Sequence, residues 1–439
     1  AGDPVATGSR TIRAALPAYT ANTFAPDGVF RFGYEEAMKN PAWTAYADFK
    51  VNGPYKNSGR NFQHDDRLEA PLVEDADYGS PLYQSDGSGF DRGHVVTMSD
   101  ISYRYGDQAG TDSCRMSNVI PQFSYFNQRI WQNLESAVGG ETVNNVFNNG
   151  LSATFRRVWI YTGPVYTGTI NYWLPGSNSY TTSPASGVKA IAIPTACYKI
   201  MVAEPASGQT RPRVMAWLSS NRSYESIENT DLWKYVTSLK RVEDLTGLNF
   251  LPDLTDDDGT LAAWKAQVDV RGWGTDFEKA TGPNVHMIKP SWDILPITGS
   301  NALSGFTVNA GDSVTFEAAV SPNAAGGSSV DTTNGCTWTF GDNSGTTRHG
   351  LTTDHVYYDT GSYTVTFSAT DGTTTNSISR KITVIDPTLP TISTIANVNT
   401  DNTTAKTVTF TVADGTPAAP PLAVTASSSN TSVLLDNLA

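Results

Sequence analysis

The stretch Asp91-Arg92-Gly93-His94 is the most informative part of the sequence. It is followed by Ser117-Asn118-Val119-Ile120-Pro121-Gln122 and by Asn127, Trp131 and Glu135. These residues lie within fewer than fifty positions of one another. They bring together an imidazole, a guanidinium group, side-chain amides and a carboxylate. Such a mixture predicts a chemical site rather than a purely structural segment.

The chain as a whole is typical of globular domains. It has 439 residues, of which 39% are apolar, 10% aromatic and 17% charged. This length predicts roughly two to four folded units. The most apolar stretch, residues 189–203, is interrupted by Pro194 and Lys199 before it reaches the ~20 residues that a membrane helix needs. We therefore expect a soluble chain with no membrane span.

The net charge of −13 excludes a globally basic nucleic-acid binder. Residues 1–295 carry 26 Lys and Arg against 32 Asp and Glu, and residues 296–439 carry 4 against 11. Any attraction for a polyanion must therefore be local. The candidates are the arginines near the opening motif: Arg60, Arg92, Arg104, Arg115 and Arg129.

Cysteine usage and the start of the chain bear on the compartment. The chain begins at Ala1 without a signal-like segment, and its composition favours an exported protein from which the signal has been removed. It has three cysteines. A disulfide between Cys114 and Cys197 and three buried free thiols are about equally compatible with the sequence, and Cys336 lies in another region.

The first region predicts an α+β fold. Residues 1–24 resemble a loose N-terminal arm, and residues 25–255 form the first domain. β-Rich runs between Gly, Pro and Asn turns predict a central, mostly antiparallel sheet. The expected strands are 157–161, 188–193, 197–202 and 214–218, and the expected helices are 124–138 and 231–245. Residues 256–297 are a linker or an extension of unknown role.

The hydrophobic pattern of the sequence changes after residue 297. Val314, Phe316, Ala318 and Val320 alternate with polar residues, as do Tyr363, Val365, Phe367 and Ala369. This period predicts strands of an all-β sandwich. The segments Trp338-Thr339-Phe340-Gly341-Asp342, His355-Val356-Tyr357 and Gly361-Ser362-Tyr363 resemble the PKD domain over residues 298–385. Residues 386–439, with Val408, Phe410 and Val412 on one face, predict a partial immunoglobulin-like module.

His94 and Arg92 are candidates for phosphodiester chemistry. A neutral imidazole can take a proton from water, and Gly93 allows a close approach of the backbone. Arg92 projects to the same side of an extended strand and offers paired donors to phosphate oxygens. A structural histidine and a salt bridge of Arg92 with Asp91 or Asp100 are the alternatives.

The expected helix 124–138 has one apolar stripe and one polar face. Phe126, Ile130, Leu134 and Val138 form the apolar stripe. Asn127, Trp131 and Glu135 recur every four residues on the other side. Because Mg²⁺ accepts a few protein oxygens and keeps several waters, an amide and a carboxylate at this spacing fit a magnesium site. A polar face that only caps loops is equally compatible with the spacing.

Taken together, these motifs resemble the DNA/RNA non-specific endonuclease family, the ββα-metal nucleases that include endonuclease G. The resemblance rests on the stretches above, with Arg60-Asn61-Phe62, and extends through Tyr161-Thr162-Gly163-Pro164, Ile193-Pro194-Thr195, Tyr198-Lys199, Leu245-Thr246-Gly247-Leu248 and Phe250. It implies that His94 is the general base and Asn127 the direct Mg²⁺ ligand, with Mn²⁺ as a substitute. It also implies that Glu135 holds metal-bound water, that Arg92 and Arg60 contact phosphate, and that Asn118 shapes the site. Ser113-Cys114-Arg115 departs from the family pattern, and Arg115 is a candidate replacement contact.

The resemblance leads us to expect a secreted enzyme that cleaves DNA and RNA and leaves 5′-phosphate ends. A catalytically inactive protein that binds nucleic acid or matrix is the alternative, and a narrower phosphodiesterase is a third interpretation. For the PKD-like module we expect a spacer role or weak contact with matrix or a cell surface.

Overall fold

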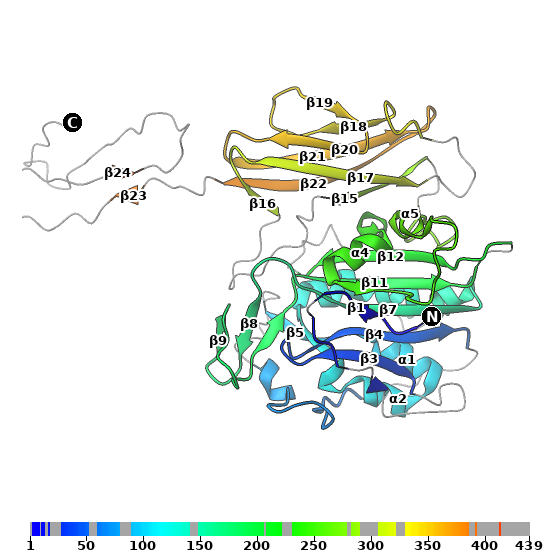
Figure 1. Cartoon of the computed structure of the whole chain (residues 1–439), viewed down its shortest axis with the longest axis vertical. Helices are drawn as coiled ribbons and strands as arrows, with labels where there is room; N and C mark the ends of the chain where they lie inside the picture. The colour runs from blue at the N-terminus through cyan, green and yellow to red at the C-terminus, as the bar shows by residue number, and fades with distance from the viewer. Residues whose placement is uncertain are drawn as a thin grey trace, which may run out of the picture.

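A central antiparallel sheet organises the first domain of the computed structural model (Figure 1). The structure describes residues 2–8, 10–13, 16–17, 28–51, 59–79, 89–140, 148–205, 208–221, 231–278, 282–289, 306–321, 330–385, 391–392 and 412–413. The seven strands of the sheet run in the order β13 (Val236–Thr237), β12 (Arg213–Ser220), β11 (Ala196–Ala203), β7 (Arg157–Val165), β4 (Asn40–Phe49), β3 (Phe30–Glu35) and β2 (Leu16–Pro17). The predicted α+β fold and antiparallel sheet are confirmed.

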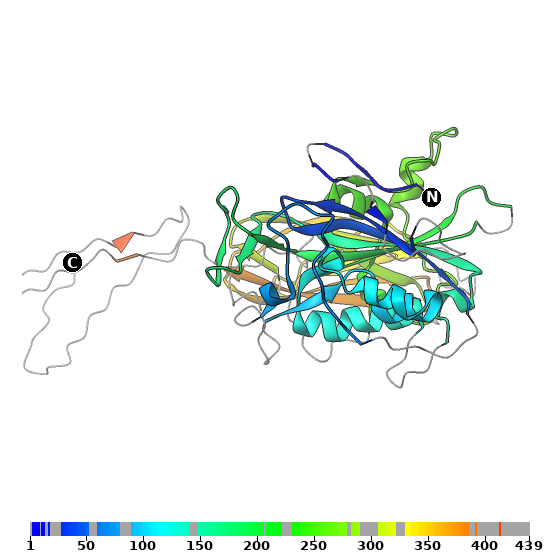
Figure 2. The same cartoon turned by 90° about the horizontal axis from the view of Figure 1, so that it is seen from below.

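Both faces of this sheet are buried, as the alternation along β11 shows. Cys197 and Met201 belong to one apolar cluster, whereas Tyr198 and Ile200 belong to another. Successive side chains of a strand point to opposite faces, so the sheet separates two cores. In Figure 2 the helices α1 (Met98–Tyr105), α2 (Asp107–Ser113) and α3 (Gln132–Gly139) lie along one side of the sheet.

A separate two-stranded antiparallel sheet and the helix after it carry the motifs of the first region. Strand β5 (Phe90–His94) pairs antiparallel with β6 (Val119–Phe123), so that His94 lies opposite Val119. The expected helix 124–138 is confirmed, with one difference. Residues Phe126–Trp131 form a π-helical turn ahead of α3. Such wide turns occur often at functional sites, and this one changes the angle between Asn127 and Glu135.

Several other predicted boundaries need correction. The expected helix 231–245 is a 3₁₀ turn, η6 (Leu232–Tyr235), then strand β13, and only then α4 (Leu239–Thr246). The β-branched pair of β13 adds an edge to the sheet, and Ser238 then caps α4 by accepting a hydrogen bond from the Arg241 N–H at 3.1 Å. The expected strand 188–193 is reduced to β10 (Ile191–Ile193), which pairs with β8 (Asn171–Leu174).

The N-terminal residues, expected to form a loose arm, pair with the domain at two points. Strand β1 (Val5–Ala6) pairs with β14 (Leu248–Asn249), and β2 joins the central sheet. Residues 256–297 divide between the two domains. Val270, Trp273 and Phe277 pack in the first core beyond α5 (Leu261–Ala266), whereas β15 (Asn284–Lys289) pairs with a strand of the second domain.

The second domain is an all-β sandwich, as predicted. One sheet runs β15, β17 (Ser313–Ser321), β20 (Thr352–Val356) and the other runs β16 (Phe306–Asn309), β22 (Thr375–Ile385), β21 (Gly361–Thr370), β18 (Cys336–Thr339), β19 (Thr347–His349). The alternating residues of β17 and β21 face the shared core. Of residues 386–439, the structure describes only the pair β23 (Thr391–Ile392) and β24 (Val412–Ala413), so Val408 and Phe410 lie outside the described residues.

The sandwich packs against the first domain through η6. Trp233 packs against the sandwich core, and its carbonyl lies 3.1 Å from His286 Nδ1 on β15. Arg380 donates a hydrogen bond to the Lys234 carbonyl at 2.8 Å and lies over the Tyr235 ring. Among the described residues, no helix combines the length and the apolar character needed to cross a bilayer.

This division predicts where the chain can be shortened. A protein ending at residue 278 keeps the first core, whereas one ending at residue 296 also keeps β15 without its partner β17. Val285, which is 0% exposed in the sandwich core, would then face water. We expect the longer fragment to self-associate and the shorter one to be monomeric, as measured by light scattering. Identical behaviour of the two fragments would contradict this assignment of β15.

Candidate active site on the β5–β6 strand pair

The side chain of Gln122 on β6 lies directly against Gly93 on β5. A Cβ atom at position 93 would lie 2.1 Å from Gln122 Oε1. Real Cβ atoms do not tolerate such a distance, so only glycine fits beside the buried Gln122. Because side chains alternate along a strand, Arg92 and His94 lie on the same side of β5, on either side of the glycine.

His94 lies half-buried between an aromatic ring and a thiol. The Phe62 ring centroid is 5.2 Å from the imidazole centroid, and Cys114 Sγ is 3.4 Å from Nε2. Burial, followed by the positive charges of Arg60 and Arg92, lowers the pKa of His94 to about 3. The imidazole is therefore neutral at pH 7 and can accept a proton.

The two predicted phosphate contacts, Arg92 and Arg60, lie beside His94. Arg92 stacks over the Phe62 ring at 4.7 Å and forms an exposed ion pair with Asp75, rather than with Asp91 or Asp100. An exposed pair contributes little stability, so a phosphate can compete with Asp75 for Arg92. Arg60 is exposed, and its charge acts on both His94 and Glu135.

Arg115 and Asn118 have structural partners. Arg115 donates a hydrogen bond to the His64 carbonyl at 3.1 Å, which ties it to the neighbouring segment. Asn118 is 0% exposed, accepts a hydrogen bond from the Val96 N–H at 2.8 Å, and donates to the Val96 and Ser113 carbonyls. Asn118 therefore braces the chain that follows His94, in line with the shaping role expected for it.

Asn127 presents its amide oxygen because its nitrogen is held by Asp91. Asn127 Nδ2 donates to Asp91 Oδ2 at 2.9 Å, and Ser124 and Gln128 also donate to this carboxylate. Within the described residues, Asn127 Oδ1 accepts no hydrogen bond. The orienting role of Asp91 was not predicted, although Asp91 belongs to the opening motif. A fixed amide with a free oxygen fits the direct Mg²⁺ ligand expected at this position.

Glu135, on α3, lies within the electrostatic reach of Arg60, as His94 does. Thr97 Oγ1 donates to Glu135 Oε1 at 2.6 Å, and burial raises the pKa of this carboxyl. Lys199, whose role was also not predicted, counteracts this rise; it is 0% exposed, and its Nζ lies 4.8 Å from the Trp131 ring centroid. The described residues contain no cluster of three or more His, Cys, Asp or Glu side chains suited to a metal. The amide oxygen of Asn127 and the carboxylate of Glu135 are still ligand types that suit an ion that keeps most of its waters.

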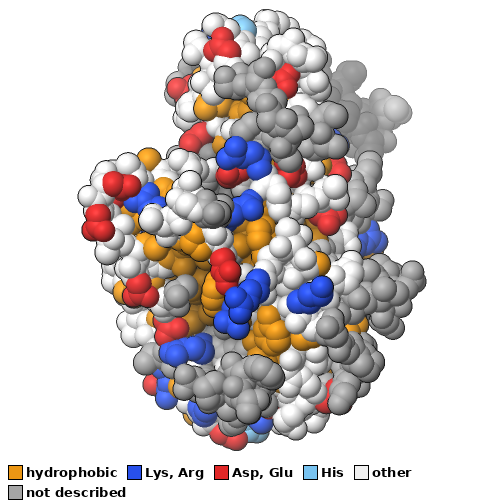
Figure 3. Space-filling model, turned by 90° about the vertical axis from the view of Figure 1, so that its right-hand side faces the viewer, with side chains coloured by type: hydrophobic (Ala, Val, Ile, Leu, Met, Phe, Trp, Pro, Cys, Tyr) orange, Lys and Arg blue, Asp and Glu red, His pale blue; other side chains and the backbone are white. Residues whose placement is uncertain are grey.

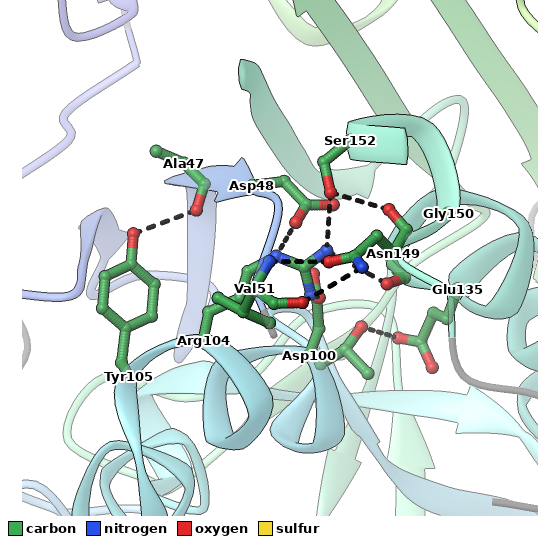
Figure 4. Close-up of polar contacts among 12 residues, drawn as sticks. Ala47, Asp48, Val51, Asp100, Arg104, Tyr105, Glu135, Asn149, Gly150 and Ser152 are labelled. Carbon is green, nitrogen blue, oxygen red and sulfur yellow. Dashed lines mark hydrogen bonds and ion pairs between the residues drawn. The ribbon is translucent and has the colours of Figure 1, made fainter. Parts of the chain in front are cut away.

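A buried guanidinium group holds the elements behind this centre (Figure 4). Arg104 on α1 forms ion pairs with Asp48 of β4 and Asp100 of α1. It also donates hydrogen bonds to the Gly139 carbonyl at 3.1 Å and to Ser152 Oγ at 3.3 Å. The sheet and the helix that carries Glu135 are thus joined by one side chain.

Removing this guanidinium group should destabilise the domain strongly. Arg104→Met leaves two buried carboxylates without their cation, which costs about 3–5 kcal/mol of unfolding free energy. Urea unfolding measures the change. The control is Lys240→Met, which removes an exposed pair with Asp244 and should cost no more than about 0.5 kcal/mol. Equal effects of the two substitutions would refute the role of Arg104.

The depressed pKa of His94 makes the protein less stable in acid. Between the ordinary histidine pKa of ~6.5 and the folded value of about 3, the unfolded chain binds a proton that the folded chain does not. Stability therefore falls as the pH falls through this window. We expect His94→Gln to reduce the loss of melting temperature between pH 7 and pH 4.

His64 provides a control of opposite sign. Its hydrogen bond to Glu74, with the charges of Glu74 and Asp66, raises its pKa, so its contribution is present at low pH and is lost as the pH rises. His64→Gln should therefore increase the melting-temperature loss in acid. The same direction of change in both variants would show that the site of His94 is not what sets the acid response.

The surface charge agrees with local rather than global attraction for a polyanion. On the face drawn in Figure 3, groups of Lys and Arg side chains are interspersed with acidic and hydrophobic ones. All three cysteines are free and buried, so the structure has no disulfide between Cys114 and Cys197.

Comparison with known proteins supports the same assignment. The family model for DNA/RNA non-specific endonuclease matches residues 8–257, and the model for the PKD domain matches residues 300–384. Mitochondrial endonuclease G is 28% identical over 214 residues in Bos taurus and 28% over 204 residues in Homo sapiens, covering 48% and 46% of this chain. A nuclease of Nostoc sp. is 26% identical over 235 residues, covering 52% of this chain and 72% of its own length.

The chain spans 63% and 60% of the length of the two endonuclease G proteins. A solved structure of an EndoG/EndoGI complex aligns with 57% of this chain and 89% of its own, at 19% identity and a TM-score of 0.41. The family model covers more than half of the chain and includes the strands β5 and β6 and the helix α3. This chain therefore belongs to the DNA/RNA non-specific endonuclease family and carries a PKD domain after its nuclease domain.

Proposed function

We propose that the first domain hydrolyses phosphodiester bonds in DNA and RNA and leaves 5′-phosphate ends. The observation that carries the proposal is the neutral, half-exposed imidazole of His94 beside Arg92 and Arg60. Family membership supports the substrate class. The proposal includes Mg²⁺ as the cofactor, with Mn²⁺ as a substitute, because the amide oxygen of Asn127, oriented by Asp91, and the carboxylate of Glu135 suit a hard ion.

In this mechanism His94 takes a proton from the attacking water while the water oxygen bonds to phosphorus. Arg92 and Arg60 bind the non-bridging oxygens and offset the growing negative charge. The bond from phosphorus to the 3′ oxygen then breaks. Asn127 would hold Mg²⁺ directly and Glu135 through water; the bound ion supplies positive charge to the departing oxygen.

The arginines also affect His94 through charge. In the free protein their charges help to lower the pKa of His94. A bound phosphate supplies the opposite charge, so the imidazole should become a stronger base when substrate is present. The free site thus stays unprotonated, and the bound site is better able to hold the transferred proton.

Cleavage of supercoiled plasmid and of single-stranded RNA tests the proposal. With Mg²⁺, the natural sequence should cleave both, and His94→Ala should lower kcat by about 10² or more. Asn127→Ala should require more Mg²⁺ for the same rate. His349→Ala is the matched control, because His349 is exposed on β19 of the sandwich.

The ends of the products provide a further readout. Fragments with 5′-phosphates accept a kinase label only after phosphatase treatment. If neither nucleic acid is cleaved with Mg²⁺, Mn²⁺ or Ca²⁺, the proposal fails. Binding without cleavage would instead favour the alternative, an inactive protein that binds nucleic acid or matrix.

We propose that the sandwich acts as a spacer or a weak matrix contact and that the protein is secreted. The sandwich pattern, and the lack of a metal-binding cluster of His, Cys, Asp or Glu in the described part of this domain, support the first point. The fragment ending at residue 278 separates the two roles, because its turnover on short oligonucleotides depends on the nuclease domain alone.

A further inference from the structure

The sulfur atom of Cys114 lies between the imidazole of His94 and the sulfur atom of Met98. Cys114 Sγ is 3.4 Å from His94 Nε2 and 3.5 Å from Met98 Sδ. Both sulfur atoms belong to buried residues, at 0% exposure for Cys114 and 7% for Met98. Cys114 is a departure from the family pattern that the sequence singled out, and the proposed function gives it no role.

The donors and acceptors in this row can be assigned. A thioether has no proton, so the contact between Cys114 and Met98 is a hydrogen bond only if the thiol donates. Burial raises the pKa of the Cys114 thiol, which therefore keeps its proton. With its proton directed at Met98, the sulfur of Cys114 can only accept from His94 Nε2.

The other nitrogen of His94 supports this arrangement. Within the described residues, Nδ1 has no hydrogen-bond partner. A proton on Nδ1 would meet no acceptor among the described side chains and would add to the positive electrostatic environment that Arg60 and Arg92 create. A proton on Nε2 satisfies both sulfur contacts and leaves the lone pair of Nδ1 free.

We propose that Cys114, backed by Met98, is a positioning residue that holds His94 as its Nε2–H tautomer and leaves Nδ1 as the atom that accepts the proton from water. The proposal deepens the proposed nuclease function and, for its catalytic part, rests on it. In the same way, a hydrogen-bond partner on one imidazole nitrogen of a catalytic or metal-binding histidine fixes the role of the other nitrogen.

The surrounding backbone holds Cys114 in place for this role. Its N–H donates to the Thr111 carbonyl at 3.0 Å, and its own carbonyl accepts from the Gln63 N–H at 3.3 Å. The Phe62 ring, next to Gln63, contacts the imidazole. The ring and the thiol therefore restrain the imidazole together, and a change at position 114 should alter the tautomer more than the fold.

Nitrogen NMR of protein labelled with ¹⁵N-histidine tests the tautomer directly. The His94 signals are assigned by their loss in His94→Gln. In the natural sequence at pH 7, Nδ1 should show the shift of an unprotonated nitrogen and Nε2 that of a protonated one. Cys114→Val removes the acceptor, and Met98→Leu removes the acceptor of the thiol proton at similar volume. Both should move the signals toward a mixture of tautomers.

Activity should follow the tautomer. We expect Cys114→Val to lower kcat about tenfold or more with little change in KM, because the base is misoriented while phosphate binding is kept. Cys114→Ser should recover much of the rate, since a hydroxyl can also accept from Nε2. Cys336→Ala, which removes a buried thiol from the sandwich, is the matched control and should leave kcat unchanged.

The outcomes separate this proposal from the proposed function. An unchanged His94 tautomer in both Cys114→Val and Met98→Leu overturns it, even if the rate falls. A changed tautomer with an unchanged kcat also overturns its catalytic part. If the natural protein cleaves no nucleic acid, the nuclease function fails, but the NMR shifts still decide whether Cys114 sets the tautomer.

Discussion

The buried ion pairs of Arg104 are the constraint on which the nuclease domain depends. The guanidinium group is enclosed by carboxylates from β4 and α1 and reaches a carbonyl at the end of α3. A charge buried in this way is tolerable only with its partners in place, so these elements cannot move independently without a large free-energy cost. The distance between Thr97, at the start of α1, and Glu135, on α3, follows from this arrangement.

The site combines this rigid support with a balance of charge. Asp91 orients Asn127, and the charge of Lys199 opposes the effect of burial on Glu135. Burial, aided by the charges of Arg60 and Arg92, keeps the imidazole neutral, and both arginines remain exposed to an incoming phosphate. The state of Asn127, of Glu135 and of His94 is thus set in part by other charged residues. Local charge can serve a polyanionic substrate even though the chain carries a net charge of −13.

Local patterns in the sequence predicted much of the fold, and long-range contacts account for what was missed. The period of β17 and β21 and the apolar stripe at Phe126, Ile130 and Leu134 reflect one buried face each, and both are present in the structure. The π-helical turn, in contrast, has no corresponding period in the amino-acid sequence. Arg104 joins residues far apart in the chain, and β15 finds its partner in another domain. For the site, the motif predicts His94 and Asn127 as site residues, whereas neither the orientation of Asn127 by Asp91 nor the buried Lys199 has a signal in the spacing.

The three free thiols have a practical consequence for handling the protein. Each is enclosed within a different set of packed side chains, and none forms a covalent cross-link. The native state therefore needs no oxidant to form and loses no bond to a reductant. Refolding of a denatured sample therefore requires neither a glutathione couple nor a disulfide isomerase.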